Sequence, residues 1–329
     1  MKKLTLIFMA ALLVIAASSC KKDKDNEIEN DDTTSIITPT TTTADDGVFN
    51  PSKKIHKCYY KSPYEEEKEL EEVWNWDGTK LASIDHYYFS GTVGFSEIFN
   101  YQNDQLAKVE SSDDDTEYTT YTYNAKGKFD KVKACYYDDG DIEYVFSYGS
   151  DGRVSEINAV SQVEWFLKDF SSLASMWMPK QAADRLAEGL AKLESRRDGE
   201  DDGEMVIKIT FTWEGNNIRQ ASVVTKVTVD ENNYLDSNMS FSFNYDNKNN
   251  PKKGYTGLYF MDEYYFLYEY YSKNNINHLE GEYWCRECYD GELYEENDTQ
   301  SNDFYYEYDE DGFPTMQNRD GSIYYFEYQ

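Results

Sequence analysis

Apolar and polar residues alternate along much of this chain, and this period of two is typical of half-buried β-strands. The clearest run extends from Val206 to Trp213. One face of that run carries large apolar side chains and the other a mixture of Val, Lys and Thr: Ile207, Ile209, Phe211 and Trp213 alternate with Val206, Lys208, Thr210 and Thr212. From Ser240 to Tyr245, aromatic residues alternate with Ser and Asn in the same way. The pattern predicts a sheet that buries an aromatic face and exposes a polar face to water.

One unit of this pattern recurs along the chain. Its clearest copy is Phe146–Ile157, in which a strand ending at Tyr148 runs into the turn Ser150-Asp151-Gly152 and the apolar pattern resumes at Val154. Asp and Gly suit such a turn, because Asp hydrogen-bonds its own backbone and Gly accepts a positive φ. In the other copies an aromatic residue again lies five or six residues before an apolar residue or Pro: Trp76 and Leu81, Tyr101 and Leu106, Tyr123 and Phe129, Trp213 and Ile218, Tyr245 and Pro251, Tyr271 and Ile276, and Tyr308 and Pro314. From Trp76 to Tyr148 the aromatic position advances by 25, 22 and 25 residues, so one repeat has the length of one β-hairpin.

The repeat resembles the YD repeats of the RHS family, most closely at Tyr306–Gly312 and Phe243–Asp246. It is also similar to the repeats in YD-repeat lipoproteins of gut Bacteroidetes, a family of unknown function with a porin-like β fold. The resemblance extends from about Val73 to Gln329 with one interruption, and it implies a mainly β domain of sequential hairpins. The toxin-enclosing function of the large RHS shells does not carry over, because those shells need many more repeats.

Together these observations predict the fold class. We expect a mainly β protein in which an antiparallel sheet of sequential YD-type β-hairpin repeats is curled or barrel-like but soluble. A true porin is not expected, because a membrane barrel needs an apolar outward band. The second face of the strands here consists of Ser, Thr, Lys, Asn and Glu.

Between Tyr148 and Trp213 the repeats are interrupted by a segment with helical periodicity. Apolar residues recur there at three- and four-residue spacing in two groups separated by Pro179: Val163, Phe166, Phe170, Leu173 and Trp177, then Ala183, Leu186, Leu190 and Leu193. We predict a helical hairpin over residues 161–195 that plugs or caps the sheet. In an alternative interpretation Trp165, Trp177 and Met178 form a ligand platform, although an aromatic stripe at helical spacing more often belongs to a core.

The first 47 residues predict export and lipid anchoring. Residues 1–19 combine a basic start, an apolar stretch of signal-peptide length and the small residues Ala17-Ser18-Ser19 before Cys20. This lipobox predicts that Cys20 becomes the new N-terminus and carries the acyl chains that anchor the protein in a membrane. Residues 20–47 contain abundant Thr and Asp and no aromatic residue, as expected of a disordered tether. Residues 48–329 then form a single Tyr-rich β-repeat domain.

The charge pattern bears on localisation and partners. Lys21–Glu27, directly after the lipidated cysteine, is similar to the surface-export signals of Bacteroidetes lipoproteins, and a solvated spacer is the alternative. We therefore expect an outer-membrane lipoprotein that faces the cell surface or the periplasm. The net charge of −31 argues against nucleic acid as a partner, because such binding needs Lys and Arg.

The sequence predicts no catalytic, cofactor-binding or metal-binding residue. It contains three His, and the motifs of serine hydrolases, zinc proteases and P-loop proteins do not occur. Cys285 and Cys288 have redox-motif spacing but lie in a strand pattern, which favours a disulfide or free buried thiols over redox catalysis. Residues 111–117 and 138–141 offer oxygen ligands for Ca²⁺, but they do not follow the EF-hand pattern and we interpret them as solvated acidic turns.

The leading functional hypothesis is a non-enzymatic binding or scaffold lipoprotein for a glycan or protein partner, since Tyr and Trp can stack on sugars or anchor interfaces. One alternative is an enzyme that acts on extracellular polysaccharide through an Asp/Glu pair. Another is a purely structural envelope lipoprotein whose aromatic residues all lie in the core. A cleft lined by exposed aromatic residues would favour the first hypothesis, and two facing buried carboxylates in a pocket would favour the second.

Overall fold

The computed structural model describes residues 46, 49–88, 91–113, 118–136, 140–162, 174, 177–194, 203–255, 267–319 and 321–329. The chain divides into two compact units, residues 1–40 and 41–329, and every described residue belongs to the second. The predicted signal peptide and Cys20 lie outside the described residues, as does nearly all of the predicted tether.

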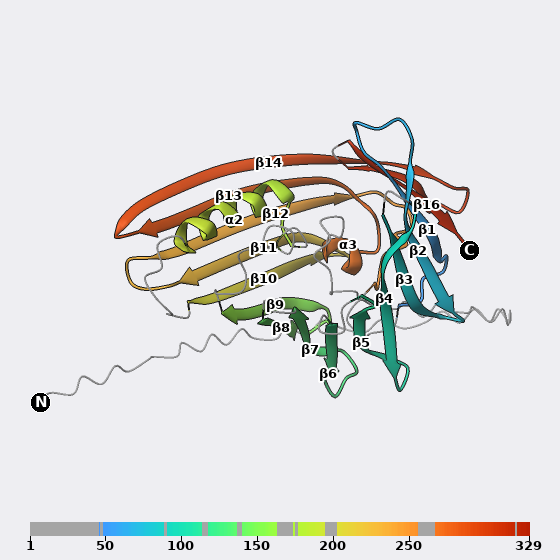
Figure 1. Cartoon of the computed structure of the whole chain (residues 1–329), viewed down its shortest axis with the longest axis horizontal. Coiled ribbons are helices and arrows are strands. Elements are labelled where there is room, and N and C mark those ends of the chain that lie inside the picture. Colours follow the sequence, from blue (N-terminus) through green and yellow to red (C-terminus); the bar gives the residue numbers. More distant parts are fainter. Residues whose placement is uncertain are drawn as a thin grey trace, which may run out of the picture. The chain divides into compact units, whose positions relative to one another are not determined.

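The described residues form sixteen strands, which Figure 1 labels in chain order. Their bounds are β1 (Ile55–Lys61), β2 (Glu69–Asp77), β3 (Lys80–Tyr87), β4 (Val93–Gln102), β5 (Gln105–Ser111), β6 (Tyr118–Tyr123), β7 (Phe129–Tyr136), β8 (Gly140–Tyr148), β9 (Val154–Gln162), β10 (Glu204–Glu214), β11 (Asn217–Thr228), β12 (Tyr234–Tyr245), β13 (Ile276–Tyr289), β14 (Glu292–Tyr308), β15 (Pro314–Arg319) and β16 (Ser322–Tyr328). Two helices accompany them, α2 (Lys180–Glu194) and α3 (Leu267–Tyr271).

The sheet closes into an antiparallel barrel. Each strand pairs with the strands before and after it in the chain, and β1 pairs with β16 through Cys58↔Phe326 and Tyr60↔Tyr324. The predicted mainly β, antiparallel arrangement is confirmed, but the prediction of a soluble, curled sheet of YD repeats is wrong. Closure satisfies two edges that an open sheet would leave unpaired, and it depends on a pairing between chain ends that no local pattern reveals.

Six of the eight copies form hairpins with a β-bulge at the aromatic residue. The copy at Tyr271 does not, because Tyr271 lies in α3, and the copy at Tyr245 leads through α3 to β13. In the copy that includes β8 and β9, the register shifts between Ser147 and Tyr148 just before the turn, and Gly152 in that turn has a φ of 79°. Equivalent register shifts occur at Trp76, Tyr101, Tyr123, Trp213, Tyr245 and Tyr308. A bulge increases the local twist and bends its strand, which helps a long meander to close.

An aromatic ladder connects successive hairpins. A ring hydroxyl or indole N–H of one hairpin donates a hydrogen bond to a backbone carbonyl of the neighbouring strand. The donor and acceptor pairs are Trp76 and Ile55 (2.8 Å), Tyr101 and Leu81 (3.0 Å), Tyr123 and Leu106 (2.6 Å), Tyr148 and Phe129 (2.9 Å), Trp213 and Val154 (2.8 Å), Tyr245 and Ile218 (2.8 Å), Tyr306 and Ile276 (2.8 Å), and Tyr328 and Pro314 (2.6 Å). The Tyr308 hydroxyl contacts the Asp246 carboxylate instead, so Tyr306 is the donor in the last repeat.

The apolar faces of the strands form one core with the two helices. α2 lies along β12 and β13 (Figure 1) and buries Leu186 and Leu190. At Gly189 an added Cβ would come within 2.5 Å of Glu287 Oε1 and 2.7 Å of Leu235 Cδ1, so a larger residue would have to displace the ends of these two side chains. The Tyr289 hydroxyl donates to the Gly189 carbonyl at 3.0 Å. Among the described residues, no helix has the length and apolar character needed to cross a membrane.

The predicted helical insertion is confirmed in its second half, since α2 corresponds to the predicted second helix. Most of the predicted first helix lies outside the described residues, and so does Trp165. Trp177 and Met178 are buried, and the Trp177 carbonyl accepts a hydrogen bond from Tyr268 of α3 at 2.7 Å. These two residues belong to the core and not to an exposed ligand platform. α3 was not predicted, because its five residues are too few to show a period.

Candidate functional site

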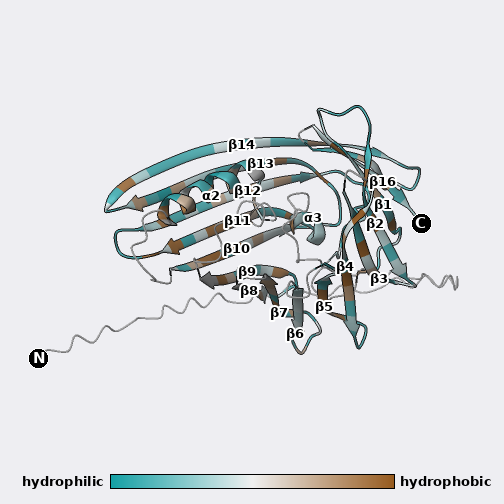
Figure 2. Ribbon diagram, in the orientation of Figure 1, coloured by the Kyte–Doolittle hydropathy of each residue, from teal (hydrophilic) through white to brown (hydrophobic). Residues whose placement is uncertain are grey.

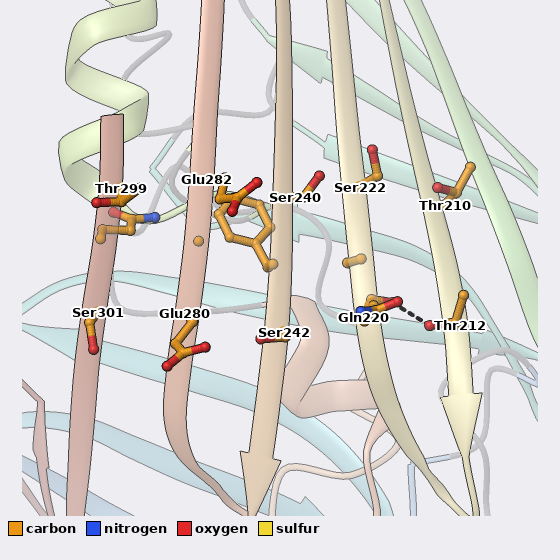
Figure 3. Close-up of a pocket in the computed structure, with 14 residues that line it drawn as sticks. Thr210, Thr212, Gln220, Ser222, Ser240, Ser242, Glu280, Glu282, Thr299 and Ser301 are labelled. Carbon is orange, nitrogen blue, oxygen red and sulfur yellow. Dashed lines mark hydrogen bonds between the residues drawn. The ribbon is translucent and has the colours of Figure 1, made fainter. Parts of the chain in front are cut away.

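The outward face of β10–β14 carries a groove of about 670 Å³. Ten of its lining side chains lie in two parallel rows that cross the five strands (Figure 3). The strand register defines the first row as Thr210, Ser222, Ser240, Glu282 and Thr299. The same pairings define the second row as Thr212, Gln220, Ser242, Glu280 and Ser301.

The groove is hollow because small residues occupy it. Most of the outward positions are Ser or Thr, and the floor between the rows includes Ala221 and Gly281. Gly281 has no side chain on the inward face, where an added Cβ would come within 2.9 Å of the Phe241 ring. The glycine therefore allows Phe241 to pack beneath the groove as part of the buried core.

Larger side chains flank the groove along β13. Trp284 follows Glu282 on the same face, and the Arg286 guanidinium lies 5.2 Å from its ring centroid. At the other side His278 Nδ1 lies 2.7 Å from Asp303 Oδ1, and His278 Nε2 lies 3.4 Å from Glu280 Oε1. The hydrogen bond to Asp303 raises the pKa of His278 above its usual value, so the imidazole holds a positive charge beside Glu280 to higher pH.

The lining chemistry suits a neutral ligand with many hydroxyl groups. Seven of the fourteen lining residues carry a hydroxyl, two carry a carboxamide and two carry a carboxylate, and Lys and Arg do not contribute. Such groups can donate and accept hydrogen bonds along the whole groove. Without a cation in the lining, the site does not suit a phosphate or another anion.

A second polar cluster lies buried near the pairing of β2, β3 and β4. His86 Nε2 lies 2.6 Å from Glu97 Oε1, and His86 Nδ1 lies 4.0 Å from Glu72 Oε1. The Tyr255 hydroxyl donates to Glu97 Oε2 at 3.2 Å, and the Trp74 indole donates to Glu72 Oε2 at 2.7 Å. Burial raises the pKa of Glu97, whose side chain is fully enclosed.

This buried cluster meets only part of the requirement for an acid–base site. Its two carboxylates are buried and lie on opposite sides of His86, but the adjoining space lined by Glu72 and Lys252 is about 20 Å³. That volume is on the order of one water molecule. A sugar unit cannot enter, and we interpret the cluster as a structural network inside the barrel.

Cys285 and Cys288 both lie on β13, but they do not form a disulfide. Cys135, Cys285 and Cys288 are free thiols, and all three are buried, as is Cys58. Cys285 and Cys288 lie three positions apart on β13 without an intervening bulge, so their side chains leave opposite faces of the sheet. Of the two alternatives left open by the sequence, the structure contains the free buried thiols.

Within the described part of the chain, no group of three or more His, Cys, Asp and Glu side chains is arranged to hold a metal ion. Of the two acidic turns, residues 114–117 and 138–139 lie outside the described residues. The Ser111 hydroxyl contacts the Asp113 carboxylate, as in a locally hydrogen-bonded turn.

Sequence reasoning did not find the groove. The polar faces of the individual strands were visible as Thr210 with Thr212, Ser240 with Ser242 and Glu280 with Glu282. A possible signal was that these i, i+2 pairs are small or acidic on successive strands. Their alignment into two rows depends on cross-strand register, which the sequence pattern leaves open.

No protein-family model matches this chain, and no curated protein matches it. Among solved structures, it is similar to a porin-like protein from Bacteroides uniformis. That structure shows 12% sequence identity and a TM-score of 0.41, and the alignment covers 84% of this chain and 98% of the other.

Proposed function

We propose that this protein is a non-catalytic binding lipoprotein that holds a neutral glycan in the groove across β10–β14. The observation that carries the proposal is the pair of rows formed by ten outward side chains, most of them hydroxylated. Neighbouring strands lie about 4.8 Å apart, and alternate residues of a strand about 6.8 Å apart. The rows therefore present hydrogen-bonding groups at regular intervals, as a chain of sugar hydroxyls requires.

The groove differs from the aromatic-lined cleft that the sequence suggested for a glycan-binding protein. Hydroxyl, carboxamide and carboxylate groups supply its contacts, and Trp284 lies at its margin as an aromatic surface. A ligand in this groove would be recognised mainly through hydrogen bonds. We expect modest affinity, because each such bond replaces a bond to water.

The proposal places the protein at the outer membrane, anchored by acyl chains on Cys20. The support comes from the lipobox and from the tether of residues 20–47, which has the composition of a flexible linker. The net charge of −31 would repel anionic headgroups, so the anchor and not the domain would hold the protein at the membrane. Exposure at the cell surface is the preferred orientation, with the periplasm as the alternative.

The experiment uses the full-length protein and a glycan array, followed by calorimetry with the best-binding glycan. Ser240→Tyr fills the first row, and we expect it to weaken binding at least tenfold, or about 1.4 kcal/mol. Thr228→Tyr is the matched control, because Thr228 is also an exposed outward hydroxyl residue but lies at the end of β11 outside the groove. Equal affinity of the two variants would contradict the proposal, as would the absence of any bound glycan.

The enzymatic alternative rests on Glu280 and Glu282, two carboxylates that share the groove. Both are exposed, whereas a general acid in a glycosidase is kept protonated by an apolar environment. The same bound glycan is therefore incubated with the protein and assayed for new reducing ends. Their release by wild type and its loss in Glu282→Gln would replace binding with hydrolysis as the function.

A further inference from the structure

Only part of β14 is paired with a neighbouring strand on both of its sides. Residues Glu295–Ser301 pair with β13, from Arg286↔Glu295 to Glu280↔Ser301. β15 pairs with β14 only from Phe304 to Tyr308, and no other strand of the described residues pairs with Glu295–Ser301 on its second side. Figure 1 shows this part of β14 as the outermost strand above β13. The segment is thus a sheet edge within an otherwise closed barrel.

The orientation of the backbone along this edge follows from one hydrogen bond. The Thr299 amide donates to the Asp298 side chain at 2.8 Å, which indicates that this amide points to the open side of the strand. In an antiparallel strand, alternate residues direct their N–H and C=O groups to the same side. The main-chain groups of Asn297 and Ser301 therefore point to the open side as well. They offer the donors and acceptors that an added strand would use.

The side chains of the edge are strongly acidic. Residues 292–303 contain five Asp or Glu and no Lys or Arg, and Figure 2 shows β14 as hydrophilic over most of its length. Two arginines from neighbouring elements already bind these carboxylates. Arg185 of α2 reaches Asp298 at 2.5 Å and Glu296 at 3.2 Å, and Arg286 of β13 reaches Glu295 at 2.7 Å. The edge is therefore accessible to guanidinium groups on both faces.

A hollow of about 430 Å³ lies beside the edge on its inward face. It is lined by Lys192 of α2, by Cys285, Glu287 and Tyr289 of β13, and by Tyr294, Glu295 and Glu296 of β14. Alternate side chains of an added strand would project into this hollow. Lys192 lies 3.6 Å from Glu287, but the three glutamates outnumber this one lysine in the lining, which favours a basic over an acidic side chain there. The Cys285 thiol is not a reactive group at this site, because burial raises its pKa to about 12.

We propose that β14 binds an extended basic peptide segment of a partner protein by strand addition along Glu295–Ser301. Main-chain hydrogen bonds to the open edge would supply affinity, and the acidic side chains and the hollow would select Lys or Arg at alternate positions. A second copy of this chain does not fit, because antiparallel pairing of two such edges would oppose acid to acid between molecules of charge −31. This edge shares Thr299 and Ser301 with the proposed glycan groove, but it uses their main-chain groups, and the proposal does not depend on glycan binding.

The test measures binding of a fluorescent twelve-residue peptide of alternating Lys and Val to the full-length protein. A peptide of alternating Glu and Val is the charge control. Asn297→Pro removes one edge amide without removing a hydrogen bond to β13, and Asn297→Ala is the matched control that keeps the amide. We expect the basic peptide to bind wild type and Asn297→Ala, the proline variant to bind at least tenfold more weakly, and the acidic peptide not to bind.

Hydrogen exchange on the wild-type protein provides a readout that does not depend on a variant that might fail to fold. Added basic peptide should slow exchange at Asn297, Thr299 and Ser301. Equal binding by the proline and alanine variants would show a purely electrostatic contact and overturn the proposal. It would also be overturned by slow exchange at the edge before peptide is added, which would indicate a covering segment of the chain itself. Self-association in ultracentrifugation that Asn297→Pro abolishes would identify a second copy as the occupant and reject the basic peptide.

Discussion

The Tyr101 hydroxyl donates a hydrogen bond to the Leu81 carbonyl at 3.0 Å, and the preceding residue, Lys80, places its ammonium 5.3 Å from the centre of the same ring. Two consecutive residues of one hairpin thus hold the aromatic residue of the next. The arrangement recurs where Lys128 and Phe129 contact Tyr148, and where Arg153 and Val154 contact Trp213. The repeat therefore encodes both a turn and a contact that joins neighbouring hairpins.

Tyr101→Phe tests the ladder hydrogen bond without removing the ring. The Leu81 carbonyl would lose its side-chain donor in a partly buried position, so we expect the free energy of unfolding to fall by about 1–2 kcal/mol. Urea denaturation measures the change. Tyr305→Phe is the control, because Tyr305 is 64% exposed and lies outside the ladder. Equal effects of the two substitutions would show that the ladder contributes no specific stability.

Tyr245→Ala removes both the ring and the hydroxyl of one residue of the aromatic ladder. The Tyr245 ring packs against the core, and its hydroxyl lies 2.8 Å from the Ile218 carbonyl and 2.9 Å from Ser272 Oγ. Loss of a buried aromatic side chain costs about 3–5 kcal/mol. We expect a clear fall in the melting temperature, measured by calorimetry against Tyr305→Ala. An unchanged melting curve would place Tyr245 outside the core.

The raised pKa of Glu97 leads us to expect that its contribution to the stability of the fold depends on pH. Burial raises its pKa in the folded protein above the ordinary value of 4.5. Between these two pKa values the folded state binds more protons than the unfolded state, so the contribution of Glu97 to stability falls as pH rises. Glu97→Gln lacks this titration. Denaturation from pH 4 upwards should therefore show wild type losing stability relative to Glu97→Gln as pH increases, and the opposite slope would contradict the assignment.

Cys20→Ser tests the lipid anchor. If Cys20 carries the acyl chains, the serine variant cannot form the thioether and should be released from the membrane fraction. Labelling of cells with a radioactive fatty acid, followed by fractionation, measures both effects. Cys58→Ser is the control for loss of a cysteine, since Cys58 is a buried thiol of the barrel. Label retained in Cys20→Ser would reject the lipoprotein prediction.

Local chemistry could be predicted from the sequence alone. The alternation at Val206–Trp213 became β10, the turn at Gly152 adopted its positive φ, and the apolar spacing from Ala183 to Leu193 became the buried face of α2. Each of these depends on interactions within a few residues, so the period of the sequence is sufficient. The aromatic position of the repeat was equally visible, although its role as a hydrogen-bond donor to the neighbouring hairpin was not.

The tertiary structure decided everything that depends on register between distant strands. Closure of β1 on β16, the two rows that include Ser240 and Glu282, and the unpaired side of β14 all require cross-strand alignment. A shift by one residue would turn every side chain of a strand to the opposite face, and many registers satisfy the same alternating pattern. Bulges and the aromatic ladder select one of them, because they specify where each hairpin must meet its neighbour.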